Sequence, residues 1–192
     1  LTHSAGGNSR SPLLIAVAEA LAESGLTVLR CDLPFRQMRP HGPPGAGSAA
    51  RDREGLRQAV MSLRKIVSGR VFLGGHSYGG RQASMLVSDE PDVAAALLLL
   101  SYPLHPPRRP TQLRTGHFSR LRVPSLFVQG TRDEFASVEE ITSALLLIPA
   151  RTKLLVIDGA GHSLAARGEL AEVAAKVKDA FQEFLAFYNS DA

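Results

Sequence analysis

The sequence predicts an α/β fold: a three-layer sandwich in which a mostly parallel sheet of about six strands has helices on both faces. Three observations predict it. Segments with strand character alternate with segments of helix character along the chain. The strand segments are continuous apolar runs, as expected for parallel strands buried on both faces. The chain has 192 residues, which suits a single domain over 1–192.

The first expected element is a helix over residues 9–24. Ser9 or Ser11 can cap it, because a serine hydroxyl accepts hydrogen bonds from the free N–H groups of a first turn. Pro12 is tolerated in that turn, and Gly25 can adopt the left-handed conformation that ends a helix. A strand is therefore expected directly afterwards.

Three segments follow this helix. The run Leu-Thr-Val-Leu-Arg-Cys at 26–31 predicts a strand. Residues 39–50 predict a loop, since three prolines and three glycines cannot pack into a regular element. A helix is expected over 52–68, with one apolar face. That face is formed by Leu56, Val60, Leu63, Ile66 and Val67.

The remaining segments continue the alternation. The apolar run 93–100 lies between turn signals, which favours a buried strand over a helix. Pro124 precedes an expected strand at 125–128. The other expected elements are strands at 71–73 and 154–157 and helices at 81–88, 139–147 and 170–188.

The chain opens with the segment Leu-Thr-His-Ser-Ala-Gly-Gly, which reads as the end of a strand and the start of a loop. A strand usually has about five residues, and only Leu1 and Thr2 precede His3. We therefore expect the natural protein to have residues upstream of Leu1.

Composition argues against several classes of function. A net charge of +4, scattered along the chain, is too small to predict nucleic-acid binding. No apolar run approaches the roughly 18 residues of a membrane span, so no membrane contact is expected. Cys31 is the only cysteine, which precludes an internal disulfide and favours a reducing, cytoplasmic location. The sequence has no zinc-site spacing, and no metal is expected.

A serine between glycines follows the strand expected at 71–73. The segment Gly75-His76-Ser77-Tyr78-Gly79 has the Gly-x-Ser-x-Gly spacing of a nucleophile elbow, a sharp turn from a strand into a helix. Small residues are needed at both ends of the turn, because bulkier ones would collide with neighbouring backbone. The N–H of Tyr78 would then lie where a helix begins and could bind a developing oxyanion.

A serine hydroxyl needs a base, and in this kind of site the acid and the histidine follow the serine along the chain. Asp133 follows the strand at 125–128, and His162 follows the strand at 154–157. The carboxyl ends of parallel strands share one edge, so both can reach Ser77 there. Glu134 is a rival acid beside Asp133. Asp158 reads as a solvated or capping residue, since it lies on the loop of His162 itself.

Five segments together resemble the α/β-hydrolase superfamily over almost the whole length: LTHSAGG, GGHSYGGR, LLLLSYPLHPP, FVQGTRDEF and DGAGHS. Within the superfamily they are most similar to the predicted hydrolases of the Tex30/KANL3-like group. The resemblance implies that Ser77 is the nucleophile, Asp133 the acid and His162 the base. The segment 3–6 matches the histidine–glycine oxyanion loop, which implies a second oxyanion donor, the N–H of Ala5.

The chain also departs from the superfamily pattern. Ser4 stands where glycine is usual in the oxyanion loop. The first two strands of the superfamily have no counterpart here. The dienelactone-hydrolase branch carries a cysteine nucleophile, where this chain has Ser77. The cap domain of the fold is inserted after the strand at 93–100, and the interval to the next strand leaves room for a minimal cap only.

That interval is basic. Residues 93–132 contain no acidic residue. Its arginines before the strand at 125–128 are Arg108, Arg109, Arg114, Arg120 and Arg122. The simpler interpretation is a solvated rim. The alternative is that Arg108 and Arg109, with Arg36 from another loop on the same face, bind an anionic substrate or an acidic partner. His105 and His117 are expected at the surface of the same interval.

The sequence thus predicts a serine hydrolase that cleaves an ester or related acyl bond of a small molecule through an acyl-enzyme. No metal or organic cofactor is needed for this chemistry. A peptide or thioester bond is an alternative target. A second alternative is a non-catalytic binding or scaffold module, because a fold alone does not fix a function.

Overall fold

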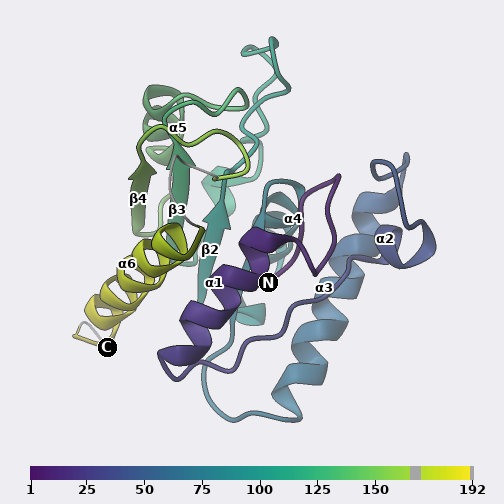
Figure 1. The fold of residues 1–192 in the computed structure, drawn as a ribbon, viewed down its shortest axis with the longest axis vertical. Helices are drawn as coiled ribbons and strands as arrows, with labels where there is room; N and C mark the ends of the chain where they lie inside the picture. The colour runs from purple at the N-terminus through teal and green to yellow at the C-terminus, as the bar shows by residue number, and fades with distance from the viewer. Residues whose placement is uncertain (165–169, 191–192) are drawn as a thin grey trace.

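Four parallel strands form the sheet of the computed structural model, which describes residues 1–164 and 170–190. Their order is β1-β2-β3-β4 (Figure 1). The strands are β1 (Phe72–His76), β2 (Ala96–Leu100), β3 (Ser125–Gly130) and β4 (Thr152–Ile157). The register sets His76 opposite Leu100 and Leu100 opposite Val128, so the loops after these strands leave from one edge.

Thr2 extends the sheet beyond β1. Its N–H donates to Gly74 O at 3.1 Å, its carbonyl accepts from His76 N–H at 2.9 Å, and it bridges Cys31 on its other side. The expected strand at 26–31 is reduced to that one bridge, between Thr2 and Cys31. The expected sheet of about six strands is therefore four strands with two bridged segments at one side.

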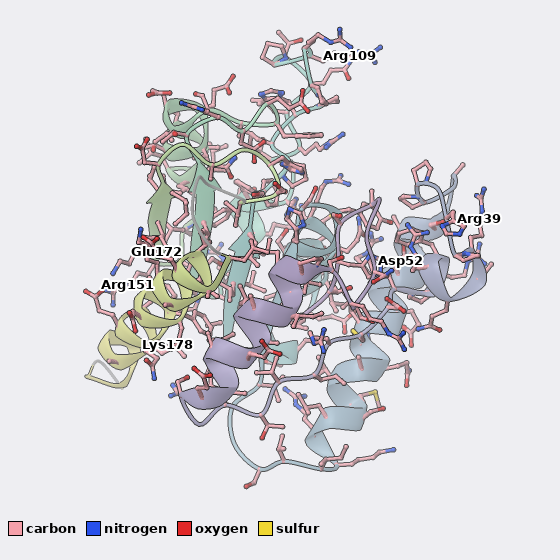
Figure 2. All side chains as sticks on the ribbon, viewed as in Figure 1. Arg39, Asp52, Arg109, Arg151, Glu172 and Lys178 are labelled. Atoms are coloured by element: carbon pink, nitrogen blue, oxygen red, sulfur yellow. The ribbon has the colours of Figure 1, made fainter. Side chains whose placement is uncertain are left out.

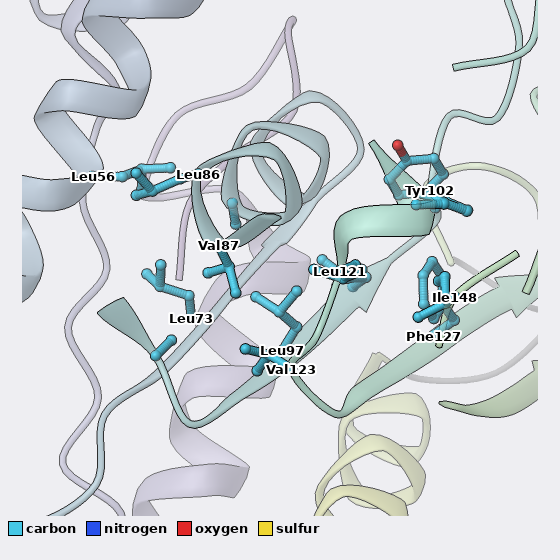
Figure 3. Close-up of a cluster of buried hydrophobic side chains, with 14 of the residues drawn as sticks. Leu56, Leu73, Leu86, Val87, Leu97, Tyr102, Leu121, Val123, Phe127 and Ile148 are labelled. Carbon is cyan, nitrogen blue, oxygen red and sulfur yellow. The ribbon is translucent and has the colours of Figure 1, made fainter. Parts of the chain in front are cut away.

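Helices cover both faces of the sheet, as the sequence predicts. The six helices of the described residues are α1 (Pro12–Glu23), α2 (Pro34–Met38), α3 (Ser48–Arg64), α4 (Tyr78–Asp89), α5 (Val138–Leu145) and α6 (Leu170–Ser190). Helices α1 and α6 pack on Leu98 and Leu100. Helices α3, α4 and α5 belong to the cluster on the opposite face, with Leu97 and Leu99 (Figures 1 and 3). The neighbours along β2 thus alternate between two cores, which is why that strand reads as a continuous apolar run.

The helices match the expected segments with two corrections. Helix α3 begins at Ser48 and ends at Arg64, so Ile66 lies beyond it and is 79% exposed instead of buried. Helix α2 was not expected. The Phe35 N–H in its first turn donates to Asp52 Oδ1 of α3 at 3.0 Å, and a cap supplied from a distant helix leaves no local signal.

The interval between β2 and β3 packs back onto the domain. It contains the 3₁₀ turn Phe118–Arg120, and another such turn, Pro91–Val93, precedes β2. His105 and His117 are buried in it, which corrects their expected exposure. His105 Nε2 lies 3.2 Å from Glu140 Oε2 of α5, and His117 Nε2 lies 2.8 Å from Ser84 Oγ of α4. Among the described residues, no helix is long and apolar enough to cross a membrane.

Candidate active site

Ser77 occupies the sharp turn between β1 and α4. Its φ of 52° and ψ of −114° are unfavourable for a residue with a side chain. Two backbone hydrogen bonds hold the turn: Ser77 N–H donates to Leu100 O at 2.8 Å, and Arg81 N–H donates to Ser77 O at 2.9 Å. The strained backbone is thereby fixed from the next strand and from the helix that follows.

The two flanking glycines make the turn possible. A Cβ at Gly75 would lie 2.8 Å from the backbone of Gly79, Gly80 and Thr2. A Cβ at Gly79 would lie 2.6 Å from His3 O. These distances are too short for carbon, so the elbow requires glycine at both places for close approach of the backbone.

The structure brings the side chains of Ser77, Asp133 and His162 together. Ser77 Oγ lies 2.8 Å from His162 Nε2, and His162 Nδ1 lies 3.0 and 2.9 Å from the two carboxylate oxygens of Asp133. An ionised carboxylate only accepts hydrogen bonds, so Nδ1 carries the proton and Nε2 is free to accept that of Ser77. Glu134 is exposed, and Asp158 Oδ1 accepts from Thr131 Oγ1 at 3.2 Å. Asp133 is therefore the acid that contacts the histidine.

Phe135 and His76 help to orient His162 and the carboxylate that it contacts. The ring of Phe135 stacks on the imidazole with centroids 4.0 Å apart, and Phe135 N–H donates to Asp133 Oδ1 at 2.9 Å. His76 Nε2 lies 2.7 Å from His162 O. Burial lowers the pKa of His76 to about 4, so its ring is neutral at pH 7 and donates its Nε2–H to that carbonyl.

The oxyanion loop is held by the buried side chain of His3. Its Nδ1 lies 2.8 Å from Ser4 O, and its Nε2 accepts from Leu33 N–H at 3.1 Å. The Nδ1–H therefore donates to Ser4 O. Within the described part of the chain, the N–H groups of Ala5 and Tyr78 have no hydrogen-bond partner. They are the two donors that the sequence predicts for an oxyanion, and that role stays a prediction.

A family model described as an alpha/beta hydrolase domain matches residues 1–189. The chain belongs to this family. Solved structures agree on the fold of this α/β-hydrolase domain. Est1E from Butyrivibrio proteoclasticus, solved with ferulic acid bound, is 21% identical with a TM-score of 0.75, covering 96% of this chain and 88% of its own.

Two further solved structures share the fold. Dienelactone hydrolase from Anabaena variabilis is 21% identical with a TM-score of 0.76, covering 95% of this chain and 83% of its own. A serine hydrolase without a lid from Xanthomonas campestris is 16% identical with a TM-score of 0.71, covering 95% and 81%. At such identities the likeness shows the fold alone.

A cavity of about 440 Å³ opens above Ser77 and His162 of this α/β-hydrolase domain. It contains Ser77 and His162 together with both proposed oxyanion donors. Its lining residues are Ser4, Ala5, Gly6, Pro43, Pro44, Ser77, Tyr78, Arg81, Pro103, Arg114, Phe135 and His162. The loop expected at 39–50 therefore forms one wall, and the loop after β2 forms the wall opposite Ser4.

The three arginines predicted to bind substrate lie in different environments. Arg36 is buried, which corrects its expected place on a solvated rim. Its guanidinium donates to the carbonyls of Ala5 and Gly7 in the oxyanion loop, at 2.9 and 2.8 Å. Arg108 and Arg109 are exposed and do not line the cavity. Figure 2 shows Arg109 at the tip of the loop after β2, far from the sheet.

The sequence reasoning missed Arg81 and gave Arg114 no role of its own. Both line the cavity beside Ser77. Arg81 follows Gly80 and lies one helical turn after Ser77, a spacing that could have placed it on the same side of α4. Arg114 lies in an irregular loop, and no pattern in the sequence marks it.

Proposed function

We propose that this α/β-hydrolase domain is a serine hydrolase that cleaves an ester or related acyl bond, as carboxylesterases do. The observation that carries the proposal is the unbroken chain of contacts from Ser77 Oγ through the His162 ring to Asp133. The family model of an alpha/beta hydrolase domain, which matches residues 1–189, supports hydrolysis in general.

The first half of the reaction acylates the serine. Ser77 Oγ attacks the acyl carbon while its proton passes to His162 Nε2, and Asp133 stabilises the imidazolium that forms. The N–H groups of Tyr78 and Ala5 bind the negative oxygen of the tetrahedral intermediate. His162 then gives its proton to the departing alcohol, which leaves as the bond between acyl carbon and alcohol oxygen breaks.

The second half frees the enzyme. Water gives a proton to His162 Nε2 as its oxygen attacks the acyl carbon of the Ser77 ester. The same N–H groups bind the second oxyanion. Collapse of that intermediate returns the proton to Ser77 Oγ and releases a carboxylic acid. Every proton in this scheme is carried by residues of this chain, so the reaction is complete without a cofactor.

A fluorophosphonate probe and a 4-nitrophenyl acetate assay test this proposal. The wild-type protein should be labelled and should turn over the ester. Ser77→Ala should lose labelling, and kcat should fall by about 10⁶, below detection. Ser143→Ala, which removes an exposed hydroxyl on α5, is the matched control and should behave as wild type. A folded wild-type protein that neither reacts with the probe nor cleaves any of a panel of acyl esters would favour the non-catalytic alternative.

The subgroup within the superfamily and the cellular location are also part of the proposal. The quoted motifs favour the Tex30/KANL3-like group within the superfamily. The single cysteine, Cys31, supports a cytoplasmic location, where thiols stay reduced.

A further inference from the structure

Two arginines line the cavity, one from helix α4 and one from the loop after β2. Arg81 belongs to the first turn of α4, and its N–H donates to Ser77 O at 2.9 Å. Arg114 lies in the loop after β2. The backbone of Arg114 is fixed at both polar groups, because its N–H donates to Leu104 O at 2.7 Å and its carbonyl accepts from Tyr102 Oη at 3.0 Å. The backbones of both residues are therefore fixed, and both line the cavity that contains the proposed nucleophile.

Neither guanidinium has an acidic partner among residues 1–164 and 170–190. The cavity lining contains no Asp or Glu. The only hydrogen bond of the Arg114 guanidinium in that part of the chain goes to Pro103 O, at 3.3 Å. Two other arginines do have acidic partners: Arg57 pairs with Glu54 and Glu90, and Arg120 pairs with Asp89.

The Arg81 guanidinium also contains an unsatisfied donor. Its Nε is buried and has no hydrogen-bond partner within the described residues. Buried polar groups in folded proteins are almost always paired, so an orphaned donor beside a cavity calls for a ligand. A guanidinium offers donors in a planar fork, which matches a carboxylate.

The two arginines are close enough to affect each other. Burial lowers the pKa of Arg114, and the positive charge of Arg81 lowers it further. Two cations that share a partly desolvated cavity repel each other, and an anion bound between them would remove that repulsion.

We propose that Arg81 and Arg114 bind a carboxylate on the substrate. The site would then hydrolyse acyl esters that carry this carboxylate close to the scissile bond. This inference rests on the proposed function, because it concerns the substrate of the same serine. It differs from the expectation for Arg108 and Arg109, whose exposed side chains lie outside the cavity.

Matched ester pairs test the inference. 4-Acetoxybenzoate and its neutral methyl ester place the charge on the alcohol side. 4-Nitrophenyl hydrogen adipate and 4-nitrophenyl hexanoate place it on the acyl side. The wild type should prefer the charged member of at least one pair by about tenfold or more in kcat/KM. In Arg81→Gln and Arg114→Gln, that charged-to-neutral ratio should fall by about tenfold, mainly through KM.

A charge-matched control and a binding measurement complete the design. Arg122→Gln removes an exposed arginine at the opposite edge of the sheet, and it should leave the ratio unchanged. Ser77→Ala should bind adipate in calorimetry, and adding Arg114→Gln should weaken that binding by about tenfold. This readout needs no catalysis, and the circular dichroism spectrum of each variant shows whether it has simply unfolded.

The outcomes separate this inference from the proposed function. Equal rates on charged and neutral esters, unaffected by either substitution, would overturn the carboxylate site while leaving the hydrolase intact. Stronger inhibition by inorganic phosphate than by adipate would overturn the choice of carboxylate. A protein that cleaves no ester but binds adipate through Arg114 would contradict the proposed hydrolase and retain the anion site.

Discussion

Closely packed neighbouring residues hold Ser77 in an unfavourable backbone conformation. The Cβ distances at Gly75 and Gly79 show that the turn is closed tightly against Thr2 and His3 of the oxyanion loop. The same contact that fixes the nucleophile therefore fixes the loop carrying Ala5. At the residue scale, the same close packing therefore sets the position of the proposed nucleophile and of its proposed oxyanion donors.

Gly79→Ala should damage both stability and activity. The added methyl group meets His3 O at 2.6 Å, and overpacking of this kind typically lowers the free energy of unfolding by about 1–3 kcal/mol. Ester turnover should fall as well, because the oxyanion loop must shift. Gly116→Ala is the control: a Cβ there meets nothing within 4 Å, and we expect a change below about 0.5 kcal/mol. Urea unfolding of both variants checks this, and equal stabilities would contradict the close-packing argument.

Arg36 is predicted to act as a positioning residue for the oxyanion loop. Besides Ala5 O and Gly7 O, it donates to Arg39 O and Gly42 O, at 3.0 and 2.9 Å. It thereby joins the oxyanion loop to the Pro-rich wall of the cavity. Lysine cannot reproduce this planar fork of donors.

Arg36→Lys should therefore lower kcat for a neutral ester by about 10-fold to 100-fold, with little change in KM, since a displaced donor weakens transition-state binding. The free energy of unfolding should fall by about 1–3 kcal/mol, because buried carbonyls lose their partners. Arg39→Lys, which alters an exposed side chain, is the control. A stability loss with unchanged kcat would show that Arg36 is structural only.

At the scale of elements, Asp52 of α3 links three helices. Its Oδ1 accepts from the Phe35 N–H of α2, and its Oδ2 accepts from Tyr78 Oη at the start of α4, at 2.7 Å. The carboxylate is fully buried, and Figure 2 shows its position between α2 and α3. The helix that opens with the proposed oxyanion donor is thus tied to the helices beside it.

Asp52→Ala should lower the free energy of unfolding by about 2 kcal/mol or more, because two buried donors lose their acceptor. Asp52→Asn should be milder, since the amide oxygen can still accept from Phe35 N–H and the NH₂ can donate to Tyr78 Oη. A double-mutant cycle with Tyr78→Phe measures the coupling. Additive effects of the two substitutions would mean that the hydrogen bond between Asp52 and Tyr78 makes no net contribution to the free energy of unfolding.

Elements with a local signal were predicted well from the sequence. The strand at 125–128 and the helix at 170–188 are present because apolar patterning alone defines them. Helix α2 was missed because its cap comes from α3, and the strand at 26–31 was overestimated because pairing depends on the neighbouring segment. The site divides in the same way: the elbow spacing predicted the turn at Ser77, and the strand ends predicted that Asp133 and His162 could reach it, while their catalytic roles stay a prediction.

The parts of the site that were not predicted depend on loops. Arg114 faces the cavity only because the irregular loop after β2 folds back over α4, and Arg36 is buried only because two loops close around it. His105 and His117 are buried by the same folding of that loop. Irregular loops have no periodicity, so their path cannot be predicted from one sequence.

For the molecule as a whole, buried histidines should make stability depend on pH. Burial lowers the pKa of His76 and of His117 to about 4. His76 lies near His162, Asp133 and His3, and the positive charges of Arg81 and Arg120 act on His117. Both rings are therefore neutral in the folded protein at a pH where an exposed histidine, with a pKa near about 6.5, is already charged.

The sign follows from proton counting. Between pH 6.5 and pH 4 the unfolded chain binds more protons at these two positions than the folded chain does, so the free energy of unfolding falls as pH falls through that range. Above this pH range, these histidines do not change the free energy of unfolding. From pH 6.5 to pH 5 the loss should be roughly 2 kcal/mol for each histidine. Carboxylates with lowered pKa values, such as Glu90 and Glu140, act mainly below that interval.

Urea unfolding at pH 7.5, 6.5, 5.5 and 5 measures this dependence. His117→Gln removes one of three buried rings whose pKa is lowered, the others being His3 and His76, while keeping a donor toward Ser84 Oγ, so the loss between pH 6.5 and pH 5 should be smaller than in the wild type. A wild-type stability that is flat from pH 7.5 to pH 5 would contradict the burial of these rings. An unchanged slope in His117→Gln would assign the effect to His3 and His76, and the donation of His76 to His162 O then links acid unfolding to the position of His162.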